Sequence, residues 1–239
     1  MSIVPNVLVS IAGLPKTGKN HLAYTFPDPI KVYCFNGGAE FVRTKFPDKV
    51  IDVHNFVLPI VESESEEWAL PVWKEFYPEY NKDIASGNYM TYVLDTGTEV
   101  ETFCRQATLE ELQEVAAEKN KQKQKLATNE YLARNLRMNA LFARARNSGV
   151  NLVALQYLRQ EWVKTKGADR AEPTGELVLD GWSQTEAQCD INLEMTTKLV
   201  AGKTVMVAMI KSNRFERAMN GKTYNDTTYD EIIALLLGE

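Results

Sequence analysis

A chain of 239 residues, 44% of them hydrophobic and 25% charged, has the composition of a globular protein, and its length fits one α/β domain spanning residues 1–239. The formal net charge of −5 argues against a uniformly basic protein that coats nucleic acid. No apolar run approaches the ~20 residues of a membrane-spanning helix, and the chain start lacks a signal-peptide pattern. Three widely separated cysteines predict neither a disulfide framework nor a metal site, so we expect a protein of the reducing cytoplasm without a membrane partner.

The first predicted element is a short apolar strand over 7–12, and the most informative motif follows it directly. Residues 13–20 match the phosphate-binding pattern G-x-x-x-x-G-K-[ST] at every position except the last. In this pattern backbone N–H groups wrap a polyphosphate, the lysine contacts the outer phosphates, and the hydroxyl ligates Mg²⁺. A helix is predicted to start near His21, so that its free N–H groups would face the anion. The alternative is a glycine-rich turn with a surface lysine. The residues expected to bind nucleotide are Gly13, Leu14, Pro15, Lys16, Thr17, Gly18, Lys19, Asn20 and His21.

Asn20 stands where the motif has a hydroxyl residue. Its amide oxygen can ligate Mg²⁺, but the side chain is neutral, longer and differently aimed. We therefore expect retained nucleotide binding with weakened metal binding. The alternative is that Asn20 is tolerated and hydrolysis proceeds slowly.

The next predicted elements are strands over 31–35 and 50–53, with a turn at 36–38 between them. Residues 62–86 are acidic and aromatic, and Pro71 and Pro78 interrupt their helical spacing. We expect short helices there that cover one sheet face. Their aromatic side chains are expected to pack in the core rather than stack on a base or cofactor.

A strand over 90–95 is followed by Thr98–Glu101, which matches a capping box and predicts the start of a helix. A second helix is expected over about 128–147, with Leu132, Leu136 and Ala140 on one face. A strand over 150–156 precedes a long loop over 159–188. Two antiparallel strands, 190–196 and 204–211, are expected to turn at 201–202, and a second capping box at 228–231 predicts a terminal helix that ends at Gly238.

Strands that alternate with helices predict a mostly parallel, doubly wound sheet, and ligands of such sheets bind at the carboxyl ends of the strands. Asp95 ends a predicted strand and is expected to hold Mg²⁺, or else to cap the following turn. Glu40 can polarise the attacking water, or it can simply stabilise a helix start. Gln156 can sense the γ-phosphate, or it is a surface amide.

Cations gather in two places. Lysines alternate at positions 119, 121, 123 and 125, and Arg134, Arg137, Arg144 and Arg146 follow; this local basic patch points to a negatively charged partner. Lys211 and Arg214 follow the last predicted strand, either as a solvated basic turn or as cations that reach the γ-phosphate of a neighbouring subunit.

These motifs occur in the order found in RecA-like ATPases. Most closely, the chain resembles the small RecA/RadA-like P-loop ATPases of bacteriophages, which are AAA-type proteins linked to single-strand annealing and recombination. The resemblance covers roughly residues 5–215 and rests on the segments 13–20, 36–40 with Phe46 and Pro47, 92–95, 152–156, 190–193 and 211–214.

The resemblance implies a RecA-like fold with ATP and Mg²⁺ as cofactors. By position, Lys19 would contact the phosphates, Asp95 and Asn20 the metal, Glu40 would be the catalytic acid and Gln156 the sensor. Lys211 and Arg214 would act between subunits. It also implies a homo-oligomeric ring or filament on single-stranded DNA in the host cytoplasm, with other phage recombination or replication proteins as further partners. The segments 118–127 and 159–188, the latter with Trp162, match the DNA-binding loops.

Three functions compete at this stage. One is an ATP-dependent recombination or annealing protein with weak hydrolysis. Another is a nucleotide-binding interaction module without useful ATPase activity. The third is a metabolic kinase, which would need an arginine-bearing lid that the sequence does not clearly show.

Overall fold

The computed structural model describes residues 6–61, 67–117, 125–164 and 170–238. Its centre is a nine-stranded sheet in the order β3-β2-β4-β5-β1-β7-β8-β9, with β6 paired to β5 outside that row. The strands from β3 to β7 in this row are parallel, whereas β8, β9 and β6 are antiparallel to their neighbours. The strands are β1 (Leu8–Gly13), β2 (Ile30–Cys34), β3 (Ile51–Asn55), β4 (Thr91–Asp95), β5 (Asn151–Val163), β6 (Glu172–Asp180), β7 (Ile191–Val200), β8 (Lys203–Asn213) and β9 (Thr223–Asn225).

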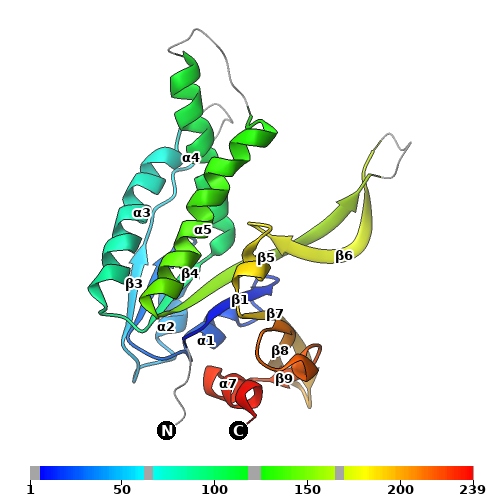
Figure 1. Cartoon of the computed structure of the whole chain (residues 1–239). Coiled ribbons are helices and arrows are strands. Elements are labelled where there is room, and N and C mark those ends of the chain that lie inside the picture. Colours follow the sequence, from blue (N-terminus) through cyan, green and yellow to red (C-terminus); the bar gives the residue numbers. More distant parts are fainter. Residues whose placement is uncertain (1–5, 62–66, 118–124, 165–169, 239) are drawn as a thin grey trace.

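Helices cover both faces of the sheet, which confirms the predicted α/β class with a mostly parallel, doubly wound sheet and a C-terminal antiparallel hairpin. Figure 1 shows α3, α4 and α5 side by side on one face. Helices α1 and α7 pack on the other. The described helices are α1 (Lys19–Ala23), α2 (Ala39–Arg43), α3 (Ala69–Ser86), α4 (Gly97–Ala117), α5 (Tyr131–Ser148), α6 (Thr185–Gln188) and α7 (Tyr229–Leu237), with 3₁₀ turns at Thr128–Glu130 and Arg217–Met219.

Successive residues of the central strands point to opposite faces of the sheet, so the protein has one hydrophobic core on each face. Leu8 and Tyr92 belong to the core under α3, α4 and α5, whereas the adjacent Val9 and Val93 belong to the core under α1 and α7. Because both sheet faces are covered, the central strands are apolar throughout. This is why their positions could be predicted from short apolar runs.

Helix α3 is one continuous helix, so the predicted interruption at Pro71 and Pro78 is wrong. Pro71 lies in the first turn, where a helix amide has no partner to lose. Pro78 lies inside the helix on its exposed side, where water can reach the carbonyl that loses its partner. The opposite side buries Trp73, Phe76 and Tyr80, and this packing outweighs the proline penalty.

The start of α3 is held by Glu110, a buried residue of α4. Oε1 of Glu110 accepts hydrogen bonds from the backbone N–H groups of Trp68 and Ala69, both at 3.1 Å, and Oε2 accepts one from Leu70 at 2.7 Å. A carboxylate from another helix therefore supplies the N-terminal cap that α3 lacks in its own sequence.

We expect Glu110→Gln to destabilise the fold by about 2 kcal/mol, because the amide loses the charge and turns an N–H₂ toward a backbone donor. Thermal unfolding should report a decrease of roughly 4–8 °C. An unchanged melting temperature would show that water replaces this cap without cost.

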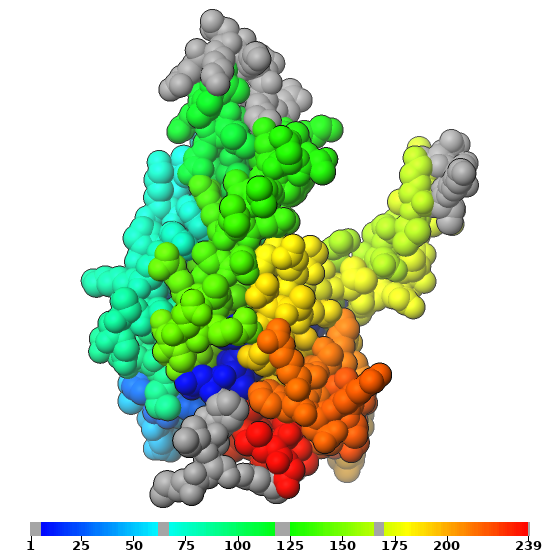
Figure 2. Space-filling view, in the orientation of Figure 1, coloured from blue at the N-terminus to red at the C-terminus, as the bar shows by residue number. Residues whose placement is uncertain are grey.

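The predicted long loop over 159–188 is wrong at residues 159–163 and 172–180, which are strands. Strand β5 continues beyond the sheet and pairs with β6, with a register shift between Gln160 and Trp162. Figures 1 and 2 show these strands standing away from the body as a two-stranded arm, here defined as residues 157–180, of which 157–164 and 170–180 are described. Because the arm meets solvent on both sides, its sequence lacks the alternation that identifies half-buried strands.

The predicted capping box at Thr98 is also wrong, because α4 already begins at Gly97. The hydroxyl of Thr98 instead donates to the carbonyl of Asp180 at 2.6 Å and accepts from the N–H of Tyr157 at 3.1 Å. It thereby ties the base of the arm to α4. The second capping box, at Thr228 and Glu231, is confirmed, and so is the hairpin turn at residues 201–202.

The predicted face of α5 is the exposed one. Leu132 and Leu136 are 62% and 59% exposed, whereas Met138, Leu141 and Phe142 are buried. The first half of α5 lies beyond the sheet beside α4 (Figure 1), where Arg134 binds Glu101 at 2.6 Å and Arg137 binds Glu111 at 2.5 Å. These arginines of the predicted basic patch therefore hold two helices together.

Candidate functional site

The carboxyl ends of the neighbouring parallel strands β2, β4, β5 and β1 meet at one edge of the sheet. Strand β1 leads into the glycine loop, β4 ends at Asp95, and β5 lies between these two strands. The register pairs Cys34 with Asp95, Asp95 with Leu155, and Ala12 with Gln156. A cavity of about 640 Å³ lies at this edge. Its lining residues are Pro15, Lys16, Gly18, Lys19, Asn20, His21, Asn36, Gly38, Phe41, Val42, Asp95, Thr96, Tyr157, Thr197, Thr204 and Met206.

Two positions of the loop require glycine. Gly18 has φ +91°, and a Cβ there would also meet the sulfur of Met206. A Cβ on Gly13 would lie 2.6 Å from the carbonyl oxygen of Met195 and 2.7 Å from Oγ1 of Thr17. The backbone conformation and close contacts of the loop therefore explain why both positions are glycine.

Lys19 lies folded over this loop. Its Nζ donates to the carbonyls of Gly13 at 2.8 Å and Leu14 at 2.9 Å, and lies 4.9 Å from the ring centre of Tyr157. Burial lowers the pKa of Lys19 to about 8, against the opposing charges of Asp95 and Glu99. A phosphate group would replace two neutral carbonyl partners with anionic oxygens, which strengthens the hydrogen bonds of the ammonium group.

Asp95 is 1% exposed and is held by two amides. Its Oδ2 accepts from Nδ2 of Asn20 at 2.7 Å, and its Oδ1 accepts from Nδ2 of Asn36 at 3.2 Å. Burial raises its pKa, and within the described ranges no lysine or arginine lies within ion-pair distance of it. A buried carboxylate without a counter-ion fits a divalent cation.

The donor set of Asn20 also fits Mg²⁺. Because Nδ2 binds Asp95, the amide oxygen Oδ1 remains for a metal, and no described residue hydrogen bonds to it. Mg²⁺ at this position would be held by oxygens of Asn20 and Asp95 and would neutralise charge on the phosphates. A threonine would use one oxygen for both tasks, whereas asparagine divides them between two atoms of its amide.

Gln156 follows the predicted strand but does not line the cavity. It is buried on the face under α6, where Oε1 accepts from the hydroxyl of Ser10 at 2.9 Å and Nε2 donates to Thr185 at 3.2 Å. Its neighbour Tyr157 lines the cavity instead, and its hydroxyl accepts from Asn36 at 3.4 Å. Sequence reasoning missed Tyr157 because the strand was expected to end at Gln156, whereas β5 continues to Val163.

Glu40 lies in α2 next to cavity-lining residues but is not one of them. Its side chain is 45% exposed and forms an ion pair with Arg43 at 3.0 Å. Its expected role with the attacking water stays a prediction.

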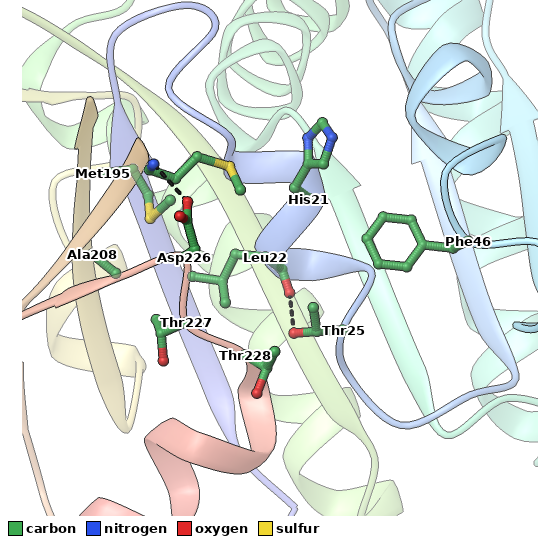
Figure 3. Close-up of a pocket in the computed structure, with 10 residues that line it drawn as sticks. His21, Leu22, Thr25, Phe46, Met195, Ala208, Asp226, Thr227 and Thr228 are labelled. Atoms are coloured by element: carbon green, nitrogen blue, oxygen red, sulfur yellow. Dashed lines mark hydrogen bonds between the residues drawn. The ribbon is translucent and has the colours of Figure 1, made fainter. Parts of the chain in front are cut away.

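A second, smaller cavity of about 110 Å³ adjoins the first, since His21 and Met206 line both. Figure 3 shows His21 and Phe46 on one side and Met195 and Ala208 on the other, with Asp226, Thr227 and Thr228 along the rim. The rings of His21 and Phe46 lie 6.2 Å apart, and Asp226 accepts a hydrogen bond from the N–H of Met206 at 2.8 Å. This cavity is apolar and flanked by aromatic rings.

Lys211 and Arg214 do not line either of these cavities. Lys211 binds Glu186 at 2.7 Å and lines a groove of about 440 Å³ under the arm, together with Arg159 and Trp162. Arg214 binds Asp190 at 3.1 Å, next to the start of β7 and therefore at the sheet edge opposite the glycine loop. Neither cation faces the phosphate loop of its own chain.

Two further expectations concern charge and metal. Lys119, Lys121 and Lys123 lie outside the described residues, and Lys125 is exposed.

Among the described residues, no group of three or more histidines, cysteines or carboxylates is arranged to hold a metal ion, and all three cysteines are buried and free. In the same ranges, none of the helices has the length and apolar character required to cross a bilayer.

The family match of this chain agrees with a phosphate loop at the strand edge. Residues 6–214 match a family model described as an AAA domain. No curated protein matches the chain. A solved KaiC-like protein from the hyperthermophilic archaeon Pyrococcus horikoshii OT3 is similar over 92% of this chain and 85% of that chain, with 12% sequence identity and a TM-score of 0.49.

Proposed function

Because the chain belongs to the AAA domain family, with a phosphate loop at its strand edge, we propose that it binds ATP with Mg²⁺, hydrolyses it slowly and acts on single-stranded DNA in recombination or annealing. The observation that carries the nucleotide part is the convergence of Lys19, Asn20 and Asp95 on one cavity. The phosphates lie over the loop amides and Lys19. The cavity of His21, Phe46 and Met206 takes the base, since its mostly apolar lining with two aromatic rings suits a purine ring.

Slow hydrolysis is proposed from the position of Asn20. Its amide already binds Asp95, and the two residues must share a metal without the single bridging hydroxyl of the usual motif. This same feature favours a second candidate function, a nucleotide-binding interaction module in which ATP holds a conformation and is not turned over usefully.

The DNA part is supported by the arm and the groove beneath it. Trp162 is 57% exposed on the arm, and Arg159 and Lys211 line the same groove. Single-stranded nucleic acid is bound by such combinations of cations, which follow the backbone, and exposed aromatic rings, on which bases stack. Lys211 and Arg214, which face away from their own phosphate loop, are proposed to reach the nucleotide of a neighbouring copy in a homo-oligomer. The other phage recombination or replication proteins implied by the sequence remain proposed partners.

We expect Trp162→Ala to weaken binding to single-stranded DNA by roughly 5- to 150-fold, the loss of about 1–3 kcal/mol of base stacking. The change should leave stability almost unaffected, since the indole is exposed. Fluorescence anisotropy with a labelled oligonucleotide measures the affinity.

Trp162→Phe is the matched control, because it keeps a stacking ring but removes the exposed indole. We expect it to retain most of the affinity and to lose most of the tryptophan quenching by DNA, since Trp73 and Trp182 are buried and Trp68 is partly buried in the core under α3. Equal affinity of the alanine variant and the wild type would place the DNA elsewhere.

An ATPase assay with and without single-stranded DNA tests the proposal as a whole. DNA-stimulated turnover supports the recombination function and excludes the non-hydrolysing module. ATP binding without turnover, with or without DNA, supports the module. A chain that shows no heat of association with millimolar MgATP contradicts both.

A further inference from the structure

Tyr157 lines the large cavity, and no sequence motif assigns it a role. It is the first residue of β5 beyond the register with β1, whose last pair is Ala12 with Gln156. Tyr157 pairs instead with Asp180 of β6, and its backbone N–H donates to Oγ1 of Thr98 in α4 at 3.1 Å. Two neighbouring elements therefore hold its backbone, so the fold fixes the position of this half-buried residue at the cavity.

The ring of Tyr157 lies beside Lys19. Nζ of Lys19 is 4.9 Å from the ring centre, within the range of a cation–π contact. The same ammonium group donates to the carbonyls of Gly13 and Leu14, which belong to the phosphate loop. In such loops the amides surround the inner phosphates and the lysine reaches the outer ones. The ring therefore lies next to the space that the outermost phosphate of a bound nucleotide would take.

The hydroxyl of Tyr157 is linked to the carboxylate proposed to hold the metal. Nδ2 of Asn36 donates to this hydroxyl at 3.4 Å and to Oδ1 of Asp95 at 3.2 Å. Oδ1 of Asn36 accepts from the N–H of Gly38 at 3.0 Å, which fixes the orientation of the amide. In phosphate-loop sites Mg²⁺ bridges β- and γ-phosphate oxygens. Tyr157 thus contacts the lysine of the outer phosphates with its ring and the metal side of the cavity with its hydroxyl.

This hydroxyl has a proton to donate. Its oxygen is the acceptor in the contact with Asn36, and none of the residues that the structure describes accepts its proton. Burial raises the pKa of Tyr157, and the charge of Glu99 acts in the same direction, so the phenol stays protonated at neutral pH. A neutral donor that lines this cavity suits an anionic oxygen, because hydrogen bonds to charged acceptors are the stronger ones.

We propose that Tyr157 distinguishes a triphosphate from a diphosphate by donating its hydroxyl proton to a γ-phosphate oxygen, an inference that rests on the proposed binding of ATP. ADP shares the loop amides and Lys19 with ATP but has no phosphate beside Tyr157, so this hydrogen bond adds affinity for ATP alone. The sequence favoured Gln156 for this contact, but the amide of Gln156 is bound to Ser10 and Thr185 outside the cavity. Tyr157 takes the role because it is the next residue of the strand and points to the other face.

The test is titration calorimetry of Tyr157→Phe with a non-hydrolysable ATP analogue and with ADP, both in the presence of Mg²⁺. This variant keeps the ring beside Lys19 and loses only the hydroxyl. We expect its affinity for the analogue to fall roughly 10- to 150-fold, the range for a hydrogen bond to a charged group. Its affinity for ADP should change by less than about threefold, because ADP does not reach the hydroxyl.

Tyr131→Phe is the matched control. Tyr131 of α5 also has a cation against its ring, with Cζ of Arg134 5.1 Å from the ring centre, but it does not line the cavity. Loss of this hydroxyl should leave both affinities at their wild-type values. A change in the control as large as that in Tyr157→Phe would overturn the proposal, since the effect would then not depend on the position of the hydroxyl.

Other outcomes also contradict the assignment. Equal losses of affinity for the analogue and for ADP in Tyr157→Phe would mean that the hydroxyl acts on a phosphate that both nucleotides share, or on the fold. An unchanged affinity for the analogue would mean that the hydroxyl does not contact the γ-phosphate. Wild-type protein that binds both nucleotides equally well overturns the role of Tyr157 and leaves nucleotide binding intact, whereas absence of binding overturns the proposed function itself.

Discussion

Lys19→Ala is expected to lower the affinity for ATP by at least about 100-fold, since it removes two or more charge-assisted hydrogen bonds to phosphate. In the absence of nucleotide, the described partners of Nζ are the carbonyls of Gly13 and Leu14 and the ring of Tyr157. Lys19 itself lines the large cavity, so water can enter the space that its side chain leaves. The fold should therefore tolerate the change, and titration calorimetry with MgATP measures the loss.

Lys45→Ala is the control for this experiment. Lys45 is an exposed lysine whose Nζ lies 5.9 Å from the ring of the cavity-lining Phe41. The Lys45→Ala variant changes the net charge near the site by the same amount as Lys19→Ala. We expect it to lower the affinity for ATP by less than about threefold, because exposed charges are screened. A similar loss in both variants would indicate that Lys19 acts only through its general positive charge.

Asn20→Thr is expected to raise ATP turnover about tenfold or more and to lower the Mg²⁺ concentration needed for half-maximal rate. A hydroxyl could donate to Asp95 and ligate Mg²⁺ through the same oxygen, which is the ligand that the usual motif supplies. ATPase rates over a Mg²⁺ titration measure both quantities.

Asn20→Ala completes the series. It removes both the hydrogen bond to Asp95 and the amide oxygen. The Mg²⁺ concentration needed for half-maximal rate should therefore be higher than in the wild type. If the threonine variant has the Mg²⁺ dependence and turnover of the wild type, then the amide of Asn20 serves the metal as well as a hydroxyl does, and the proposed slow hydrolysis has another cause.

Several elements could be predicted because their signals are local. The apolar runs of β1, β4 and the first part of β5 are buried on both faces, and the glycines of the loop fit backbone conformations and contacts that exclude a Cβ. The capping box at Thr228 satisfies orphan amides within four residues. In each case the stabilising partner is close in the sequence, so the pattern is visible in it.

Other elements were missed because their partners are distant in the sequence. The cap of α3 comes from Glu110, some forty residues later. Helix α5 buries the face opposite to the expected one, because Arg134, Arg137 and Asn135 of its first half bind Glu101, Glu111 and Trp182, which are distant in the sequence. The arm could not be recognised, since both of its faces meet solvent and carry mixed residues.

The sequence by itself determined the phosphate loop, the order of strands and helices and the departure at Asn20, since each is encoded by neighbouring residues. Tertiary structure decided which side chains face the cavity: Tyr157 lines it and Gln156 does not, although they are adjacent, because successive residues of a strand point to opposite faces. It also decided that Asn20 binds Asp95, a contact set by how α1 and the end of β4 lie relative to each other.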